Sequence, residues 1–182
     1  RFGQVVQRVL SGMKIRATVL DHDPNQIELV RRFGNKAYYG DATRLDLLEA
    51  AGVRKAKLLV VAVDNPESAM RIVKLARRHF HHLKLIVRAR SRSDAFEYHE
   101  MDVPSVRETF GAALDAAEAS LRALDFGPVA ARRVVARFRR HDEELLAEQA
   151  PHRNEVKKLV AVSLQGRQDI EQLLGSEALR KT

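Results

Sequence analysis

Segments typical of strands alternate with segments typical of helices as far as about residue 107, and this alternation restricts the fold more than any other feature of the sequence. The clearest strand is Lys57–Val63, because a continuous apolar run is typical of a strand buried on both faces of a parallel sheet. Further strands are expected at 15–20, 36–39, 83–89 and 103–106, and helices at 3–10, 24–33, 45–51, 66–80 and 94–101. This alternation predicts an α/β fold with a doubly wound parallel sheet and right-handed crossovers.

The chain opens with Arg1-Phe2-Gly3-Gln4, which has the form of the end of a glycine-rich phosphate loop. In a Rossmann-like, dinucleotide-binding fold this loop joins the first strand to the first helix, and an acid about 20 residues later binds the ribose hydroxyls. Asp21 stands at that spacing, at the end of an expected strand. The first strand and the two earlier glycines are not in the sequence. We therefore expect the sheet to lack a central strand and the chain to fold poorly by itself.

Polar residues follow the other expected strands, at the edge where open α/β sheets bind ligands. Asp41 and Thr43 follow one strand and Asp64-Asn65 follows another; each residue is a ligand candidate, and each could also cap the next helix, since both roles can hold at once. Arg88 and Arg90 alternate at the end of a further strand. Their guanidinium groups are therefore expected on one face, where they suit a phosphate or a carboxylate.

Beyond about Arg107 the pattern becomes helical. One apolar seam recurs at helical spacing, at Phe110, Leu114, Ala117, Leu121 and Leu124. After Gly127-Pro128 a second helix has an apolar face formed by Val134, Phe138, Leu145 and Leu146. Asp142 falls on that same stripe, where an acid is costly unless an arginine or a ligand pairs with it. Two helices with little sheet to cover predict an arm for a second subunit, although packing on the chain's own sheet would use the same faces.

Composition excludes several kinds of site. The 182 residues contain no cysteine, which excludes disulfides, thiolate metal ligands and a cysteine nucleophile, and no run of about 18 apolar residues could cross a bilayer. The net charge of +8 favours anionic partners, although most charge runs are typical of solvated faces. His79, His81 and His82 have no carboxylate at metal-ligand spacing. No general acid or base stands out, so we expect the nucleotide edge to bind rather than to catalyse.

Several stretches occur together in one order: Arg1-Phe2-Gly3-Gln4, Val19-Leu20-Asp21-His22-Asp23, Arg32-Phe33-Gly34, Tyr39-Gly40-Asp41-Ala42-Thr43, His79-Phe80, Arg88-Ala89-Arg90, Arg107-Glu108-Thr109-Phe110 and Phe138-Arg139-Arg140. In this order they resemble the cytosolic regulatory domain, of the potassium-channel type, of the Kef family. These are glutathione-regulated potassium efflux systems of the potassium/proton antiporter type.

The resemblance implies that AMP or a nicotinamide dinucleotide, NAD(H), binds as a regulatory nucleotide. By position, the nucleotide-binding residues would be Gly3, Asp21, His22, Asp41, Ala42, Thr43, Asp64 and Arg88. The resemblance also implies that glutathione, or a glutathione adduct of an electrophile, binds between subunits. Its residues would be Arg8, Phe33, Arg107 and Asp142. Family members carry Asn at the last of these positions; an acid could pair with the ammonium group of the peptide but would repel a carboxylate.

The resemblance further implies partners and a location. Glutathione would hold the efflux system shut and a bulkier adduct would open it. A homodimer would form through the helical arm, the membrane transport domain would belong to the same polypeptide, and a flavin-containing oxidoreductase would be an ancillary activator. The domain would lie at the cytoplasmic face of the inner membrane. The expected domains are a Rossmann-like regulatory domain at 1–107, a dimerisation arm at 108–150 and a tail at 151–182.

Two points stay open. In the tail, 159–164 fits a strand or a helix, whereas 169–179 favours a helix. A small nicotinamide-dependent oxidoreductase on the same fold is the alternative function, because the fold alone does not decide function. The lack of an acid–base pair and of a substrate domain favours a non-enzymatic regulator. Nucleic-acid binding would rest on charge alone and is not expected.

Overall fold

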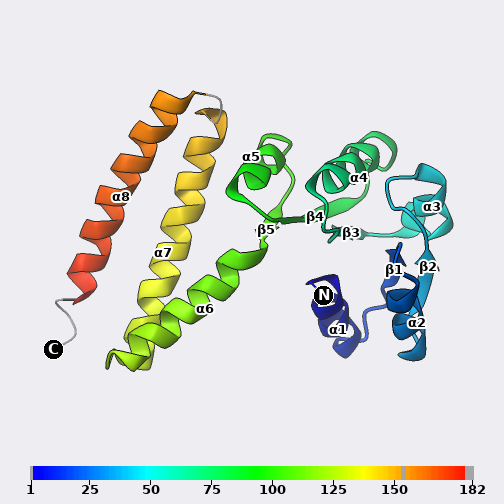
Figure 1. The fold of residues 1–182 in the computed structure, drawn as a ribbon, viewed down its shortest axis with the longest axis horizontal. Helices are drawn as coiled ribbons and strands as arrows, with labels where there is room; N and C mark the ends of the chain where they lie inside the picture. Colours follow the sequence, from blue (N-terminus) through cyan, green and yellow to red (C-terminus); the bar gives the residue numbers. More distant parts are fainter. Residues whose placement is uncertain (1, 153–154, 179–182) are drawn as a thin grey trace. The chain divides into compact units, whose positions relative to one another are not determined.

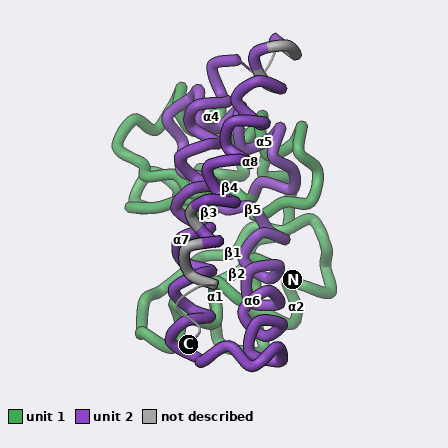
Figure 2. Tube along the Cα trace, turned by 90° about the vertical axis from the view of Figure 1, so that its left-hand side faces the viewer, with its two compact units in different colours: residues 1–88 green, residues 89–182 purple. Residues whose placement is uncertain are grey.

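The structure, a computed structural model, describes residues 2–152 and 155–178. The chain divides into two compact units, 1–88 and 89–182, which Figure 2 shows in different colours. Each unit has its own buried residues. The boundaries expected from the sequence at 107 and 150 stay predictions.

Helices and parallel strands alternate along unit 1, as predicted (Figure 1). Its elements are α1 (Phe2–Gly12), β1 (Thr18–Asp21), α2 (Pro24–Arg32), β2 (Lys36–Tyr39), α3 (Leu45–Ala50), β3 (Leu58–Val61), α4 (Pro66–His79) and β4 (Lys84–Ala89), with a 3₁₀ turn at Val53–Lys55. β1 pairs in parallel with β2, from Thr18 opposite Lys36 to Asp21 opposite Tyr39. β3 pairs in parallel with β4, from Leu58 opposite Lys84 to Val61 opposite Val87.

The strands lie in two sheets rather than one. The described residues include no strand that joins β1 to β3. One detail of the strand prediction is wrong. Leu58, expected to be buried on both faces of the sheet, is 39% exposed, whereas Val61 at the other end of β3 is buried. Among the described strands only β4 pairs with β3, so this edge is open.

The core of unit 1 is formed by the apolar faces that the sequence pattern predicts. Ile27, Val30 and Ala37 form one buried cluster, with Val19 packed against it. The buried face of α4 consists of Ala69, Ile72, Val73, Ala76 and Phe80. Full burial of a Val, Ile or Phe side chain contributes roughly 1.5–3 kcal/mol. α4 begins sharply because the Asn65 side chain accepts a hydrogen bond from the Ser68 amide at 2.7 Å, with Pro66 in the first helical turn.

Unit 2 is mainly helical. Its elements are α5 (Arg92–Glu100), β5 (Ser105–Arg107), α6 (Glu108–Ala123), α7 (Pro128–Gln149) and α8 (Val156–Ala178), with a 3₁₀ turn at Ala150–His152. α7 packs against α6 on one side and α8 on the other (Figure 1). The described part of the tail is therefore a helix, which answers the question that the sequence left open at 159–164. Residues 179–182 lie outside the described residues.

The predicted seam of α6 is only partly buried. Leu114 is buried, whereas Ala117 and Leu124 are exposed. On the other side of α7, α8 approaches closely at Gly166, whose carbonyl oxygen lies 2.9 Å from Nε2 of His141. α7 thus packs on a helix that the sequence pattern did not assign to it.

Candidate functional site

The ends of β1 and β2 lie side by side at the predicted ligand edge of unit 1. The Gly40 amide donates to the Asp21 carbonyl oxygen at 2.8 Å, which fixes the turn after β2 against the end of β1. The Asp21 carboxylate is half-buried; its Oδ1 accepts from the Asp23 amide at 3.0 Å and lies 3.6 Å from Nδ1 of the exposed His22. Both of these contacts use Oδ1, so Oδ2 of Asp21 can still accept a hydrogen bond from a ligand hydroxyl.

Asp41 and Thr43 form a local turn. The Asp41 carboxylate accepts from the Thr43 amide and from the Thr43 hydroxyl, each at 2.8 Å. These hydrogen bonds hold the pKa of Asp41 below its ordinary value, the bond from the Thr43 amide contributing most. Neither side chain caps α3, because the N-cap position is Arg44 and carries no side-chain cap bond. The capping alternative considered for these two residues is therefore wrong.

Arg88 and Asp64 meet at the ends of β3 and β4. Arg88 is only 9% exposed; its Nη1 donates to Asp64 Oδ1 at 2.6 Å and to the Ala62 carbonyl oxygen at 3.3 Å. Its guanidinium carbon lies 5.5 Å from the centre of the Phe2 ring on α1. The guanidinium is therefore fixed in direction at the predicted edge, where its partner, the Asp64 carboxylate, is exposed.

The expectation that Arg88 and Arg90 share one face is wrong. β4 ends at Ala89, so Arg90 lies after the strand and is exposed, while Arg88 is buried. The Arg90 amide instead donates to Asp94 Oδ2 at 3.0 Å, within the capping arrangement that begins α5.

Gly3 has the steric role expected of the last glycine in a phosphate loop. A Cβ atom at Gly3 would lie 3.2 Å from Cβ of Ala62, just after β3. The absence of a side chain thus allows α1 to pack closely on the strand end, as in a dinucleotide-binding turn. Ala42 completes the turn after β2, between Asp41 and Thr43.

A second constellation lies in unit 2, around Asp142 of α7. Its Oδ1 accepts from Arg92 Nη1 at 2.8 Å, and its Oδ2 accepts from Arg107 Nη2. The Asp142 and Arg107 side chains are each 14% exposed. The sequence predicts that an acid on this stripe needs an arginine or a ligand as its partner. In the structure Asp142 pairs with two arginines, one from the start of α5 and one from the end of β5.

Arg92 and Gln149 extend this network and were missed in the sequence. Arg92 Nε donates to Gln149 Oε1 at 3.0 Å, and Gln149 Nε2 donates to the Ser163 hydroxyl of α8 at 2.9 Å. Nη2 of Arg92 is buried and has no hydrogen-bond partner. No local spacing links residues so far apart in the chain, so only the packing of α5, α7 and α8 brings them together.

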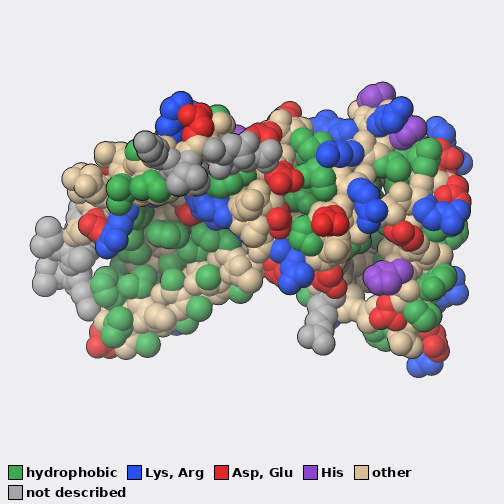
Figure 3. All heavy atoms as spheres, turned by 45° about the horizontal axis from the view of Figure 1, so that its top comes forward, with side chains coloured by type: hydrophobic (Ala, Val, Ile, Leu, Met, Phe, Trp, Pro, Cys, Tyr) green, Lys and Arg blue, Asp and Glu red, His purple; other side chains and the backbone are tan. Residues whose placement is uncertain are grey.

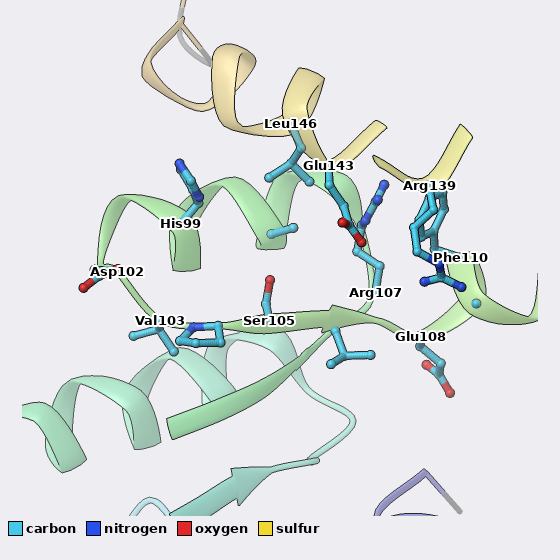
Figure 4. Close-up of a pocket in the computed structure, with 14 residues that line it drawn as sticks. His99, Asp102, Val103, Ser105, Arg107, Glu108, Phe110, Arg139, Glu143 and Leu146 are labelled. Carbon is cyan, nitrogen blue, oxygen red and sulfur yellow. The ribbon is translucent and has the colours of Figure 1, made fainter. Parts of the chain in front are cut away.

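A pocket of about 460 Å³ adjoins this network in unit 2. It lies between α5, β5 and the helices α6 and α7, and Arg107, Arg139, Glu143 and Phe110 surround one end of it (Figure 4). The guanidinium carbon of Arg107 stacks 3.7 Å from the centre of the Phe110 ring, and that of Arg139 lies 5.7 Å from it. Two cations over one aromatic ring can accept a ligand with an anionic group. Arg139 belongs to the stretch Phe138-Arg139-Arg140, for which the sequence alone predicts no contact with a ligand.

The four predicted glutathione residues fall in different units. Arg107 and Asp142 meet in unit 2. Arg8 is exposed on α1 in unit 1, and Phe33, which follows α2, is 76% exposed. Within the described ranges, no group of three His, Cys, Asp or Glu side chains could hold a metal ion. Nor is any helix in the described part of the chain long and apolar enough to span a membrane.

Together, the parallel strands, the close turn at Gly3 and the polar strand ends define a Rossmann-like domain of the nucleotide-binding class, followed by a helical extension. Comparison with known proteins agrees with this class. The TrkA-N domain family matches residues 1–107, and the potassium efflux system KefB C-terminal domain family matches residues 112–182.

Individual relatives narrow the class. The chain is 40% identical, over 163 residues and 89% of its length, to glutathione-regulated potassium-efflux system protein KefC of Escherichia coli O139:H28, and it spans 26% of that protein. It is 43% identical to the solved Shewanella denitrificans Kef CTD in AMP bound form, with a TM-score of 0.77, covering 83% of this chain and 92% of that one. The chain therefore belongs to the TrkA-N domain family, as a C-terminal domain of the Kef type, which confirms the resemblance found in the sequence.

A more distant structure shares the fold alone. The TrkA-N domain of inner membrane protein ybaL from Escherichia coli is 23% identical, with a TM-score of 0.58, covering 62% of this chain and 84% of that one. These likenesses confirm the predicted fold class, a Rossmann-like α/β domain with a helical C-terminal region.

Proposed function

We propose that this chain is the ligand-sensing cytosolic domain of a potassium efflux system. The domain gates that system, which exchanges potassium for protons. The observation that carries the proposal is the 43% identity to a Kef C-terminal domain solved with AMP, and the polar strand ends of unit 1 support it. The chain spans only 26% of the curated relative, so the transport domain of the same polypeptide is part of the proposal. The homodimer, the flavin oxidoreductase partner and the inner-membrane location belong to it as well.

The nucleotide would bind along the strand ends of unit 1. Asp21 would accept the ribose hydroxyls with its remaining acceptor capacity. Gly3 lets the backbone at the start of α1 approach a phosphate, and Arg88, fixed by Ala62 and Asp64, supplies a directed cation nearby. His22, Ala42 and the Asp41–Thr43 turn complete the proposed site. AMP and NAD(H) both fit these roles.

The regulatory ligand would be glutathione or a glutathione adduct, held by Arg8, Phe33, Arg107 and Asp142. Asp142 already occupies the guanidinium of Arg107, so a carboxylate of the ligand would have to share that arginine with it. The ammonium group of the peptide, in contrast, could pair with the Asp142 carboxylate. Two arginines already neutralise the charge of that carboxylate. Ligand orientation would therefore differ from that at a neutral amide in the same position.

Calorimetric titration of the chain with AMP, NADH, glutathione and a succinimide adduct of glutathione tests this function. We expect binding of a nucleotide and of a glutathione species, and Asp21→Ala should weaken nucleotide binding while leaving glutathione binding intact. Failure of all four ligands to bind would remove the proposal. Incubation with NADH and candidate acceptors should give no turnover; sustained oxidation would instead favour the oxidoreductase alternative.

A further inference from the structure

The edge of unit 1 where β3 and β4 begin is strongly basic. Nine exposed side chains contribute to it, and the name basic edge is used for them: Arg54, Lys55, Lys57, Arg77, Arg78, His79, His81, His82 and Lys84. They come from three places, the 3₁₀ turn at Val53–Lys55 with the residues that follow it, the end of α4, and the start of β4. Figure 3 shows histidine and basic side chains gathered on the part of unit 1 that carries the end of α4.

Two contacts join the separate segments of the basic edge. The Lys84 amide donates to the Lys57 carbonyl oxygen at 3.2 Å, so the starts of the two strands are adjacent. The guanidinium carbon of Arg54 lies 5.7 Å from the centre of the Phe80 ring, which places the 3₁₀ turn against the end of α4. The cations therefore form one surface although the sequence disperses them over some thirty positions.

Local chemistry accounts for only part of this charge. Cations at the end of α4 interact favourably with the helix dipole, which explains Arg77, Arg78 and His79. It does not explain the lysines at the starts of β3 and β4. No Asp or Glu lies within 53–57 or 77–84, and the nearby Glu49 pairs with Arg54.

The basic edge is also separate from the proposed nucleotide site. Asp21, Asp41 and Asp64 lie at the carboxyl ends of their strands or just beyond them, whereas the basic edge lies where strands begin. Because all strands of a parallel sheet run in the same direction, the starts and the carboxyl ends of the strands lie on opposite sides of it. A ligand at the nucleotide site therefore leaves the basic edge accessible.

We propose that the basic edge docks on the anionic phospholipid headgroups of a membrane. The inference rests on the proposed function, because a gating domain joined to a transport domain works beside a bilayer. Clustered Lys and Arg side chains are attracted to an anionic membrane surface within a Debye length of it. Nucleic acid fits less well, because the one Phe, Tyr or Trp ring in these segments, Phe80, is buried and cannot stack on a base.

Cosedimentation of the chain with vesicles of phosphatidylcholine, with and without phosphatidylglycerol, tests the proposal. The wild type should bind only the vesicles that contain phosphatidylglycerol, and more weakly as salt increases. Arg77→Gln/Arg78→Gln should lower the affinity by roughly 25-fold, since each of the two cations near such a surface contributes about a fivefold factor. Arg132→Gln/Arg133→Gln, which removes the same charge from exposed positions on α7, is the matched control and should change the affinity less than about threefold.

Three outcomes would overturn the inference: no preference for phosphatidylglycerol, an equal loss in the control variant, or displacement of the wild type from vesicles by a low concentration of single-stranded oligonucleotide. Circular dichroism verifies that both variants fold. AMP titration of the same samples separates this inference from the proposed function. If AMP binds and vesicles do not, only the basic edge proposal fails; if vesicles bind and no nucleotide or glutathione species does, the proposed function fails.

Discussion

Asp142 is held between two guanidinium groups, and its charge is therefore part of the stability of unit 2. Removing it leaves Arg92 and Arg107 close together without their shared anion. We expect Asp142→Ala to lower the free energy of unfolding by about 3 kcal/mol, the cost of breaking a largely buried ion pair from one side. Asp142→Asn, which keeps two polar atoms, should cost less. Urea denaturation measures both.

Asp115 offers a matched control for this substitution. It is an exposed acid on α6 in the same unit, so Asp115→Ala should change the free energy of unfolding by no more than about 0.5 kcal/mol. An equal loss in the two variants would mean that the network around Asp142 contributes nothing specific.

Tyr98 makes stability depend on pH at the alkaline end. Its side chain is 1% exposed, and burial, with smaller contributions from Asp94 and Glu97, raises the pKa of Tyr98 to about 12. In the unfolded chain the pKa returns to about 10, so the neutral phenol favours the folded state below pH 10 and this stabilisation is lost as the pH rises through 12. Tyr98→Phe should remove about 1 kcal/mol of the destabilisation that the wild type shows at pH 11.

Thermal unfolding of wild type and variant, followed from neutral to alkaline pH, measures this difference. Tyr39→Phe is the control, because that ring is 62% exposed. Parallel stability curves for the wild type and Tyr98→Phe above pH 10 would contradict the assignment.

At the level of elements, the packing of α8 on α7 depends on one glycine. A Cβ atom at Gly166 would lie 2.8 Å from both methyl carbons of Leu145. We therefore expect Gly166→Ala to lower the free energy of unfolding by about 1–2 kcal/mol, because the strain exceeds the gain in helix propensity. Gly175→Ala, on the same helix with no atom within 4 Å, should be neutral or stabilising. Equal effects at the two positions in chemical denaturation would show that α8 is not packed closely here.

The elements that the sequence predicted well are those decided by local pattern. α4 carries a complete apolar face together with Asn65 and Pro66 at its start, and β2 was placed at 36–39 as observed. The secondary structure of 159–164, within α8, could not be predicted from the sequence, because this apolar run suits a strand as well as a helix. Packing of α8 against α7 favours the helix. The exposure of Leu58 depends on which strands neighbour β3, which is not a local property.

The candidate sites follow the same division. The spacing between Gly3 and Asp21 is visible in the sequence alone and predicts their roles. The structure adds the hydrogen bond from the Gly40 amide that joins the ends of β1 and β2. No regular spacing in the sequence predicts the positions of Arg92, Gln149 and Arg139. They come together because helices that are distant in sequence pack around Asp142 and the pocket beside it. Regular patterns predict where backbone ends lie, whereas side-chain networks depend on packing between elements.

For the whole molecule, the proposed gate needs a ligand that binds two states with different affinity. Phe33 is the residue on which such a difference would rest. It is 76% exposed at the end of α2, so covering it with a ligand or a second subunit would bury a large apolar ring. A bulky group on the glutathione sulfur would compete with the ring for that covered position, whereas glutathione itself would leave the ring in place.

We therefore expect Phe33→Ala to reduce the difference in response between glutathione and its bulky adducts. Calorimetry on the chain gives the affinity ratio for glutathione and adducts of increasing size, and potassium efflux from cells that express the complete transporter gives the response. Leu29→Ala, which truncates another exposed apolar side chain on the same helix, should preserve the size dependence. If Phe33→Ala keeps the wild-type dependence on adduct size, the ring does not read the ligand, and the two states must differ elsewhere.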